Sequence, residues 1–179
     1  DSSTSDVVKM LDRARDLQGL SMEEVAILMN CNDREVVQKI LDTARYVKDT
    51  IYGKRLVLFA PLYISNLCTN ECLYCAFRVN NKDVVRRTLS REEIANETRI
   101  LIEQGHKRVL LVSGEAYPGE GFDYILKAIE TVYNTKSGPG EIRRINVNVA
   151  PLSGKEFRRL KQAEIGTYQI FQETYHLDT

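Results

Sequence analysis

The stretch CTNECLYC, residues 68–75, places Cys68, Cys72 and Cys75 in a C-x₃-C-x₂-C pattern that contains no histidine. Thiolates are the usual ligands of iron–sulfur clusters, and a [4Fe–4S] cubane offers four iron corners to such ligands. Three clustered thiols therefore leave one iron without a protein ligand. An open coordination position marks catalytic zinc sites, and we extend that rule to iron. The pattern predicts a [4Fe–4S] cluster that can bind a further ligand.

Two other kinds of cysteine site stay open at this point. A zinc site needs a fourth ligand, and C-x-x-C is only half of a usual zinc motif. His106 and His176 are distant in sequence, although the fold can bring either of them near. An electron-transfer cluster needs a fourth cysteine, and the remaining one, Cys31, fits a small packed thiol better. A non-catalytic iron–sulfur or zinc module is therefore the alternative from another class.

Composition narrows the class of protein. The chain has 179 residues, of which 43% are hydrophobic and 28% charged, as in a globular domain. Its 25 basic and 25 acidic residues cancel, so nucleic acid is not expected as a partner, and the basic pair Arg86-Arg87 is interpreted as solvated surface. No apolar run reaches the roughly 20 residues that span a bilayer, and no signal peptide is recognised. Four cysteines are few for a secreted domain, which favours the cytoplasm.

The first 55 residues predict helices. Apolar residues recur at helical spacing from Val7 to Ala14. Ser21 and Glu24 form a capping-box pattern for a second helix through Met29. Asn32 or Asp33 can cap a third helix, which Gly53 ends. We expect a helical N-terminal extension over residues 1–55.

From residue 56 onward, strands and helices alternate. Apolar runs predict buried strands at 56–64, 108–113, 142–149 and 166–171, and helices at about 90–105, 123–135 and 153–163. Such alternation predicts an α/β fold with a parallel sheet. Four βα units over residues 56–179 make half of a TIM-type (β/α) barrel, which needs about 250 residues. A short doubly wound sheet is the alternative fold.

Polar side chains follow the predicted strands, where parallel α/β folds place their ligands. These segments are CTNECLYC, Ser113–Glu115, 146–151 and 172–176. Strand alternation turns Asn148 toward the barrel lumen and places Glu173 inward near its mouth. Arg78, which follows the cysteines, is a cation that can balance a cluster's negative charge.

The C-x₃-C-x₂-C stretch after the first predicted strand resembles the signature of the radical S-adenosylmethionine (SAM) enzymes. The resemblance implies that Cys68, Cys72 and Cys75 hold the [4Fe–4S] cluster and that SAM chelates the open iron. An electron from the cluster then cleaves SAM to methionine and a 5′-deoxyadenosyl radical. The family places an aromatic residue before the last cysteine near the adenine, and Tyr74 stands there.

The same resemblance assigns a role to the segment after the second strand. In the family a Gly-Gly-Glu-type motif there contacts the SAM amino group, and this chain has Ser113, Gly114 and Glu115. A carboxylate that accepts from an ammonium is a strong, charge-assisted contact. The candidate SAM-binding residues are therefore Tyr74, Ser113, Gly114, Glu115, Asn148 and Glu173.

Five longer segments of the chain resemble the tyrosine lyase family of [FeFe]-hydrogenase maturation. By this resemblance, the chain forms part of a radical SAM barrel. The resemblance implies cleavage of L-tyrosine at Cα–Cβ to p-cresol and dehydroglycine, which yields CO and cyanide. It also implies an electron donor such as ferredoxin or flavodoxin, and hydrogenase maturation partners. The segments are IYGKRLVLFAPLYISNLC, GHKRVLLVSGE, FDYILKAIETVY, GEIRRINVNVAPLS and GTYQIFQETYH.

The last of these segments supplies Gln172 and His176 as candidate substrate-binding residues. QETYH is shared with the tyrosine lyase of thiamine-thiazole synthesis, the alternative function, whereas GEIRRINVNVAP favours the maturase. The chain departs from the family at Ala76, where glycine is expected. It also stops after the fourth predicted strand, so we expect a fragment that does not make CO or cyanide by itself.

Overall fold

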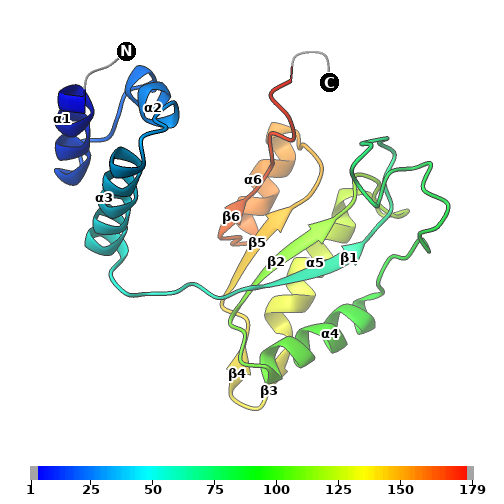
Figure 1. Ribbon diagram of the computed structural model, residues 1–179. Coiled ribbons are helices and arrows are strands. Elements are labelled where there is room, and N and C mark those ends of the chain that lie inside the picture. Colours follow the sequence, from blue (N-terminus) through cyan, green and yellow to red (C-terminus); the bar gives the residue numbers. More distant parts are fainter. Residues whose placement is uncertain (1–3, 177–179) are drawn as a thin grey trace. The chain divides into compact units, whose positions relative to one another are not determined.

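The computed structural model describes residues 4–176, and the chain divides into two compact units between Val57 and Leu58 (Figure 1). Residues before this point are helical, and residues after it form an α/β unit. Within the described residues, no helix is both long enough and apolar enough to cross a membrane.

The helical unit contains α1 (Thr4–Arg15), α2 (Met22–Met29) and α3 (Arg34–Tyr52). The predicted capping box is present, because the side chains and backbone N–H groups of Ser21 and Glu24 bond reciprocally. Asp33 caps α3 by accepting from two backbone N–H groups, and Gly53, with φ of 62°, ends it. Val7, Leu11 and Val36 form a small core of this unit.

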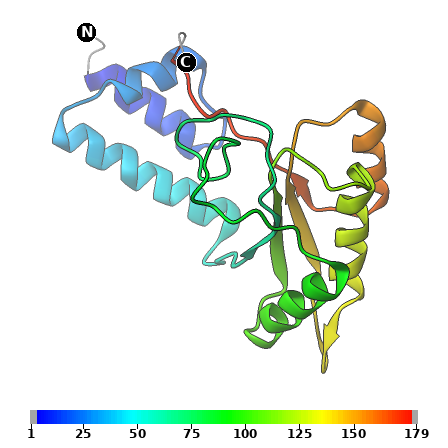
Figure 2. The same ribbon diagram turned by 90° about the vertical axis from the view of Figure 1, so that its right-hand side faces the viewer.

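The α/β unit is built on a four-stranded parallel sheet in the order β1-β2-β5-β6. Three helices lie on one face of this sheet (Figure 2), and two of them start with capping boxes, at Ser90 and Ser153. The strands are β1 (Ala60–Ser65), β2 (Arg108–Ser113), β5 (Arg144–Asn148) and β6 (Thr167–Tyr168), and the helices are α4 (Arg91–Glu103), α5 (Phe122–Asn134) and α6 (Gly154–Gln162). The predicted βα order and parallel sheet are confirmed.

The core of the α/β unit lies between the sheet and these helices. Burial alternates along β2 and β5, as expected where one face of a strand packs and the other does not. The fully buried side chains of this layer are Ile64, Ile94, Val109, Leu111, Ile125, Ile129, Val132, Ile145, Val147 and Leu160. Asn146 and Asn148 have the opposite parity, so they lie on the face turned away from the helices, as predicted for lumen residues.

The first strand is shorter than predicted. Residues 56–59 precede β1 and are exposed, Leu56 to 82%. The ladder begins with Ala60 beside Val109, and β2 itself starts at Arg108. The residues before β2 form the turn that ends α4 at Gly105, so they offer no strand for residues 56–59 to pair with. The apolar run alone did not locate this start.

The fourth strand is also shorter than predicted. β6 contains Thr167 and Tyr168, and one further ladder bond runs from the Gln169 N–H to the Val147 carbonyl. Ile170 and Phe171 are exposed, since β5 ends at Asn148 and no described strand continues beside them. Ile170 therefore does not pack against the helices.

Residues 136–141 form a short hairpin. β3 (Lys136–Ser137) pairs with β4 (Gly140–Glu141) in antiparallel register, and Gly138 adopts a φ of 53° between them. A left-handed residue at a two-residue hairpin loop is typical, because its twist matches that of the strands. The hairpin connects α5 to β5.

A core substitution tests this packing. Leu111 is fully buried in β2, so Leu111→Ala is expected to lower the free energy of unfolding by about 2–5 kcal/mol, through lost burial and a cavity. Leu58→Ala is the matched control, because Leu58 is 67% exposed, and it is expected to change stability by less than about 0.5 kcal/mol. Urea unfolding of both variants measures the difference. Equal effects would contradict the assignment of the core.

Candidate functional site

The three cysteines lie on a long excursion between β1 and α4, residues 66–88, here named the cysteine loop. Its two ends are tied together. The Asn66 N–H donates to the Arg87 carbonyl (3.1 Å), the Arg87 N–H donates to Asn66 Oδ1 (2.7 Å), and Asn66 Nδ2 donates to the Val85 carbonyl (2.8 Å). The Leu89 N–H also donates to the Ile64 carbonyl at 2.8 Å. These bonds form a neck that closes the loop where it leaves the sheet.

Side chains from the core reinforce this neck. Ser65 and Thr88 share a hydrogen bond of 2.9 Å between their hydroxyls. The Tyr124 hydroxyl, from α5, lies 2.9 Å from the carbonyl oxygens of both Ile64 and Leu89. Desolvation and the charge of Glu93 raise the pKa of Tyr124 to about 12, so the hydroxyl is a neutral donor near pH 7. The neck is therefore anchored in the sheet and in α5.

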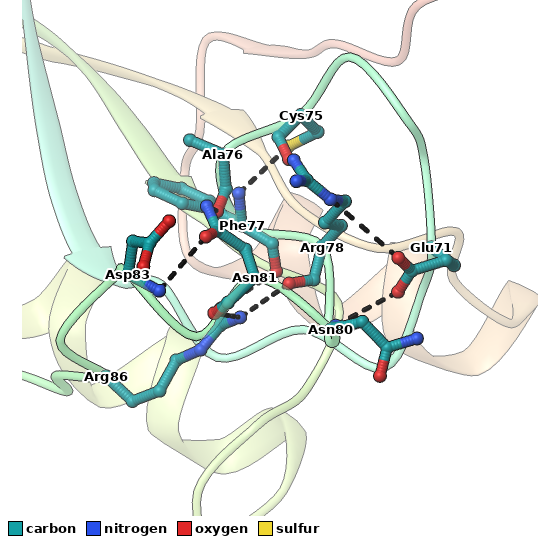
Figure 3. Close-up of polar contacts among 9 residues, drawn as sticks. All are labelled: Glu71, Cys75, Ala76, Phe77, Arg78, Asn80, Asn81, Asp83 and Arg86. Atoms are coloured by element: carbon teal, nitrogen blue, oxygen red, sulfur yellow. Dashed lines mark hydrogen bonds and ion pairs between the residues drawn. The ribbon is translucent and has the colours of Figure 1, made fainter.

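All three thiols of the loop are free. Cys68 and Cys75 are half-buried and Cys72 is exposed. The Cys75 N–H donates to the Cys72 carbonyl at 2.9 Å, which makes a turn of the C-x₂-C segment. The Phe77 N–H donates to Cys75 Sγ at 3.4 Å (Figure 3). Hydrogen bonds to ligating sulfurs are among the features that tune iron–sulfur clusters, so this donor set fits such a cluster.

The residues around the loop do not form a compact single-ion site. Among residues 4–176, no three His, Cys, Asp or Glu side chains lie close enough together to hold one metal ion. In a cubane each thiolate binds a different iron, so its ligands need not converge on one point. The fit of Cys68, Cys72 and Cys75 to a cluster rests on their chemistry and shared loop.

The second half of the loop folds back on the first (Figure 3). Glu71 accepts from the Asn80 N–H at 3.0 Å and pairs with the Arg78 guanidinium at 3.8 Å. Asn81 donates to the Ala76 carbonyl at 2.9 Å. Arg78 thus lies beside the cysteines, as expected of a charge-balancing cation, but its charge is shared with Glu71.

The segment after β2 packs directly on the cysteine loop. The Gly114 N–H donates to the Ser65 carbonyl at 3.0 Å, and Asn70 Nδ2 donates to Glu115 Oε2 at 2.6 Å. A Cβ on Gly114 would overlap the Leu67 carbonyl oxygen and would lie 3.4 Å from Cβ of Cys68. Glycine at this position is thus required by the close approach of two backbones. Sequence reasoning did not single out Asn70, and an amide inside the cysteine motif was its only signal.

The Ser113 side chain points away from this contact. It shares the parity of the buried residues of β2, is 7% exposed, and donates to the Gly114 carbonyl at 3.1 Å. Asn148 lies on the opposite face of the sheet and donates to the Gln169 carbonyl at 2.9 Å. Ser113 is therefore held by a local bond and Asn148 by a bond to the neighbouring strand segment, on different faces of the sheet.

The C-terminal segment reaches the cysteine loop through Glu173. The Tyr74 hydroxyl lies near the Glu173 carboxylate, and both side chains are exposed. Desolvation of the hydroxyl is the main cause that raises the pKa of Tyr74 to about 12, although the side chain as a whole is 67% exposed. The neighbouring Glu173 and the charges of Cys72 and Cys75 raise this pKa further. Two candidate SAM ligands that are distant in sequence are thus neighbours in the fold.

Gln172 and His176, the candidate substrate-binding residues, lie in the C-terminal segment. Both are exposed, and the contacts described for them are local: Gln172 Nε2 donates to the Thr174 carbonyl (2.7 Å), and the His176 N–H donates to Thr174 Oγ1 (3.0 Å). Both residues follow β6 in the C-terminal segment. Their role in binding substrate stays a prediction.

The Arg86-Arg87 pair corrects the expectation of a solvated basic rim. Arg87 is exposed and pairs with Glu93 at 2.7 Å, as expected of surface charge. Arg86, in contrast, is half-buried, and its guanidinium is enclosed by backbone carbonyls of the cysteine loop (Figure 3). The sequence alone does not indicate which arginine of such a pair is exposed and which is enclosed by carbonyls.

Comparison with known proteins decides the family. The model of the radical SAM superfamily matches residues 62–178. The chain belongs to the radical SAM superfamily. Enzymes of this superfamily use a [4Fe–4S] cluster and SAM, in agreement with the cluster that the cysteine pattern predicted and with the SAM that the resemblance implied.

Individual radical SAM proteins are similar over nearly the whole chain. The crystal structure of HydG, a maturase of the [FeFe]-hydrogenase, superposes with a TM-score of 0.94 at 43% identity over 98% of this chain. HydG from Carboxydothermus hydrogenoformans gives a TM-score of 0.84 at 43% identity over 96% of this chain. The 2-iminoacetate synthase of Escherichia coli K12 is 29% identical over 93% of this chain. The chain spans 38%, 39% and 42% of the lengths of these three relatives, respectively.

Substitution of Gly114 tests the contact between the two loops. Gly114→Ala forces Leu67 and the neighbouring Cys68 to move, so the free energy of unfolding is expected to fall by about 1–3 kcal/mol, with less iron bound after reconstitution. Gly119→Ala is the matched control, because a Cβ there meets nothing within 4 Å. Thermal unfolding and iron analysis measure the two effects. Normal stability and iron content in Gly114→Ala would disprove the constraint.

Proposed function

We propose that Cys68, Cys72 and Cys75 hold the [4Fe–4S] cluster of this radical SAM protein and leave one iron open for SAM. The donor set supports this: three free thiols share one closed loop, and the Phe77 N–H donates to Cys75 Sγ. These residues would hold a cluster that, when bound, would supply the electron for cleavage of SAM to methionine and a 5′-deoxyadenosyl radical. The surrounding residues bind and orient SAM.

The SAM-binding residues that we propose come from the ends of four strands. Tyr74 and Glu173 lie near each other and near Cys72 and Cys75, which suits contacts with the adenosine part of SAM. Glu115 lies against the cysteine loop, where its carboxylate can accept from the SAM ammonium. The other members of the proposed set are Asn148, Gly114 and Ser113, of which Ser113 would act through its backbone because its side chain faces the core.

For the whole protein we propose a tyrosine lyase reaction. The observation that carries it is the match to HydG, at 43% identity over 98% of this chain with a TM-score of 0.94. By that likeness, the 5′-deoxyadenosyl radical acts on L-tyrosine, and Cα–Cβ cleavage gives p-cresol and dehydroglycine, the source of CO and cyanide for [FeFe]-hydrogenase maturation. Gln172 and His176 are proposed to contact this substrate.

The second candidate is the tyrosine lyase of thiamine-thiazole synthesis. It is favoured by the similarity to 2-iminoacetate synthase, which extends over 93% of this chain. The identity of 29% is lower than the 43% shared with HydG, so the maturase is the first choice. In either case we propose a cytoplasmic protein reduced by a donor such as ferredoxin or flavodoxin, and for the maturase, hydrogenase maturation partners.

The cluster assignment is tested by cysteine substitution. Anaerobic reconstitution of the purified protein with iron and sulfide is expected to load about four irons per chain, with a spectrum that SAM alters. Cys72→Ala removes one ligand and is expected to abolish SAM cleavage. Cys31→Ala is the control, because Cys31 lies outside the cysteine loop and its thiol is bonded to the Ile27 carbonyl. Bound zinc, or SAM cleavage that survives Cys72→Ala, would refute the assignment.

The reaction is tested on the full-length protein. Dithionite, SAM and L-tyrosine are expected to give p-cresol together with CO and cyanide, detected by chromatography and by infrared spectroscopy of trapped products. Production of p-cresol without CO or cyanide selects the thiazole-pathway lyase. No p-cresol under conditions in which SAM is cleaved would remove both tyrosine-lyase proposals.

A further inference from the structure

The guanidinium of Arg86 binds the backbone at both ends of the segment that carries the cysteines. Nη1 donates to the carbonyls of Asn66 and Phe77, each at 2.8 Å. Nη2 donates to the carbonyls of Arg78 (2.6 Å) and Asn81 (3.4 Å). Figure 3 shows the last three of these acceptors gathered around the Arg86 side chain.

These four carbonyls bracket the thiols. Asn66 lies two residues before Cys68, and Phe77 lies two residues after Cys75. A single planar group therefore fixes the distance between the start and the end of the C-x₃-C-x₂-C segment. The guanidinium carries five donors in a rigid fork, whereas a lysine ammonium is a point charge on a flexible stem. Four carbonyl acceptors that come from different turns can all be bound by the guanidinium of an arginine, whereas the ammonium of a lysine does not fit their arrangement.

The position of Cys75 depends on the same group. Phe77 donates its N–H to Cys75 Sγ while its carbonyl is held by Arg86. Arg78 donates its N–H to the Cys75 carbonyl at 3.2 Å, and its own carbonyl is also held by Arg86. Phe77 and Arg78, which both donate hydrogen bonds to Cys75, are therefore each anchored to the guanidinium.

Arg86 is not an ion-pair partner in the contacts described for it. It is half-buried, and its hydrogen bonds are to neutral carbonyl oxygens. Donors held against carbonyls cannot also bind a sulfide or a ligand, so Arg86 acts on the loop and not on the reacting groups. A loop ordered in this way loses its conformational entropy during folding and not when the cluster binds.

We propose that Arg86 is a positioning residue that sets the shape of the cysteine loop before the cluster is bound, through its fork of donors and not through its charge. This inference rests on the proposed function of Cys68, Cys72 and Cys75 as cluster ligands. It makes Arg86 a determinant of cluster retention although it contacts no sulfur.

The test compares Arg86→Lys and Arg86→Gln with Arg87→Lys, the matched control whose side chain pairs with Glu93 outside the loop. In the cluster-free protein, anaerobic alkylation followed by mass spectrometry gives the reaction rate of each cysteine. In the reconstituted protein, a chelator gives the rate of iron loss. Both Arg86 variants are expected to lose iron about tenfold faster than the parent protein, a change that corresponds to the loss of a charge-assisted hydrogen bond. In both variants, Cys68 and Cys75 are also expected to be alkylated faster than in the parent protein. Arg87→Lys is expected to match the parent protein.

Several outcomes overturn the proposal. Iron retention in Arg86→Lys equal to that of the parent would show that charge alone suffices. A fall in the unfolding temperature of the cluster-free Arg86→Lys protein as large as that of Leu111→Ala would show a general role in stability. If the parent protein takes up no iron, the proposed function fails, and the alkylation rates still decide the role of Arg86. Unchanged rates at Cys68 and Cys75 would then refute it.

Discussion

The parallel pairing of β1 with β2 is the interaction on which the candidate site depends. Its register sets Ser65 beside Ser113, so the two chain segments that follow leave the sheet at the same edge and height. The Gly114 N–H extends this ladder by bonding the Ser65 carbonyl, and Asn70 then reaches Glu115. Backbone hydrogen bonds of the sheet thereby bring the cysteine loop to the segment proposed to bind SAM.

Close packing at this junction depends on side chains that are absent or small. Gly114 admits the Leu67 carbonyl where any other residue would place a carbon atom. The apolar core that the strands and helices bury behind this contact stabilises the sheet on which the contact is built. The sheet thus supplies the rigidity, and the loops after its strands supply the chemistry, as is usual for parallel α/β folds.

Much of this arrangement follows from sequence pattern, because periodicity and capping are local properties. The capping boxes at Ser21, Ser90 and Ser153 could be predicted, as could the parallel sheet and the cysteine loop at the end of its first strand. The start of β1 could not, since an apolar run does not reveal where a partner strand begins. Arg86 could not be distinguished from Arg87, because the acceptors around it come from turns whose shape the sequence does not encode locally.

The neck at Asn66 determines which bonds of the loop survive oxidation of the thiols. Its hydrogen bonds use amides, carbonyls and the hydroxyls of Ser65, Thr88 and Tyr124, and none of them uses sulfur. Oxidation of the thiols therefore leaves the closure of the loop and the sheet behind it intact. The bonds that close the loop are thus independent of the thiols that are proposed to hold the cluster.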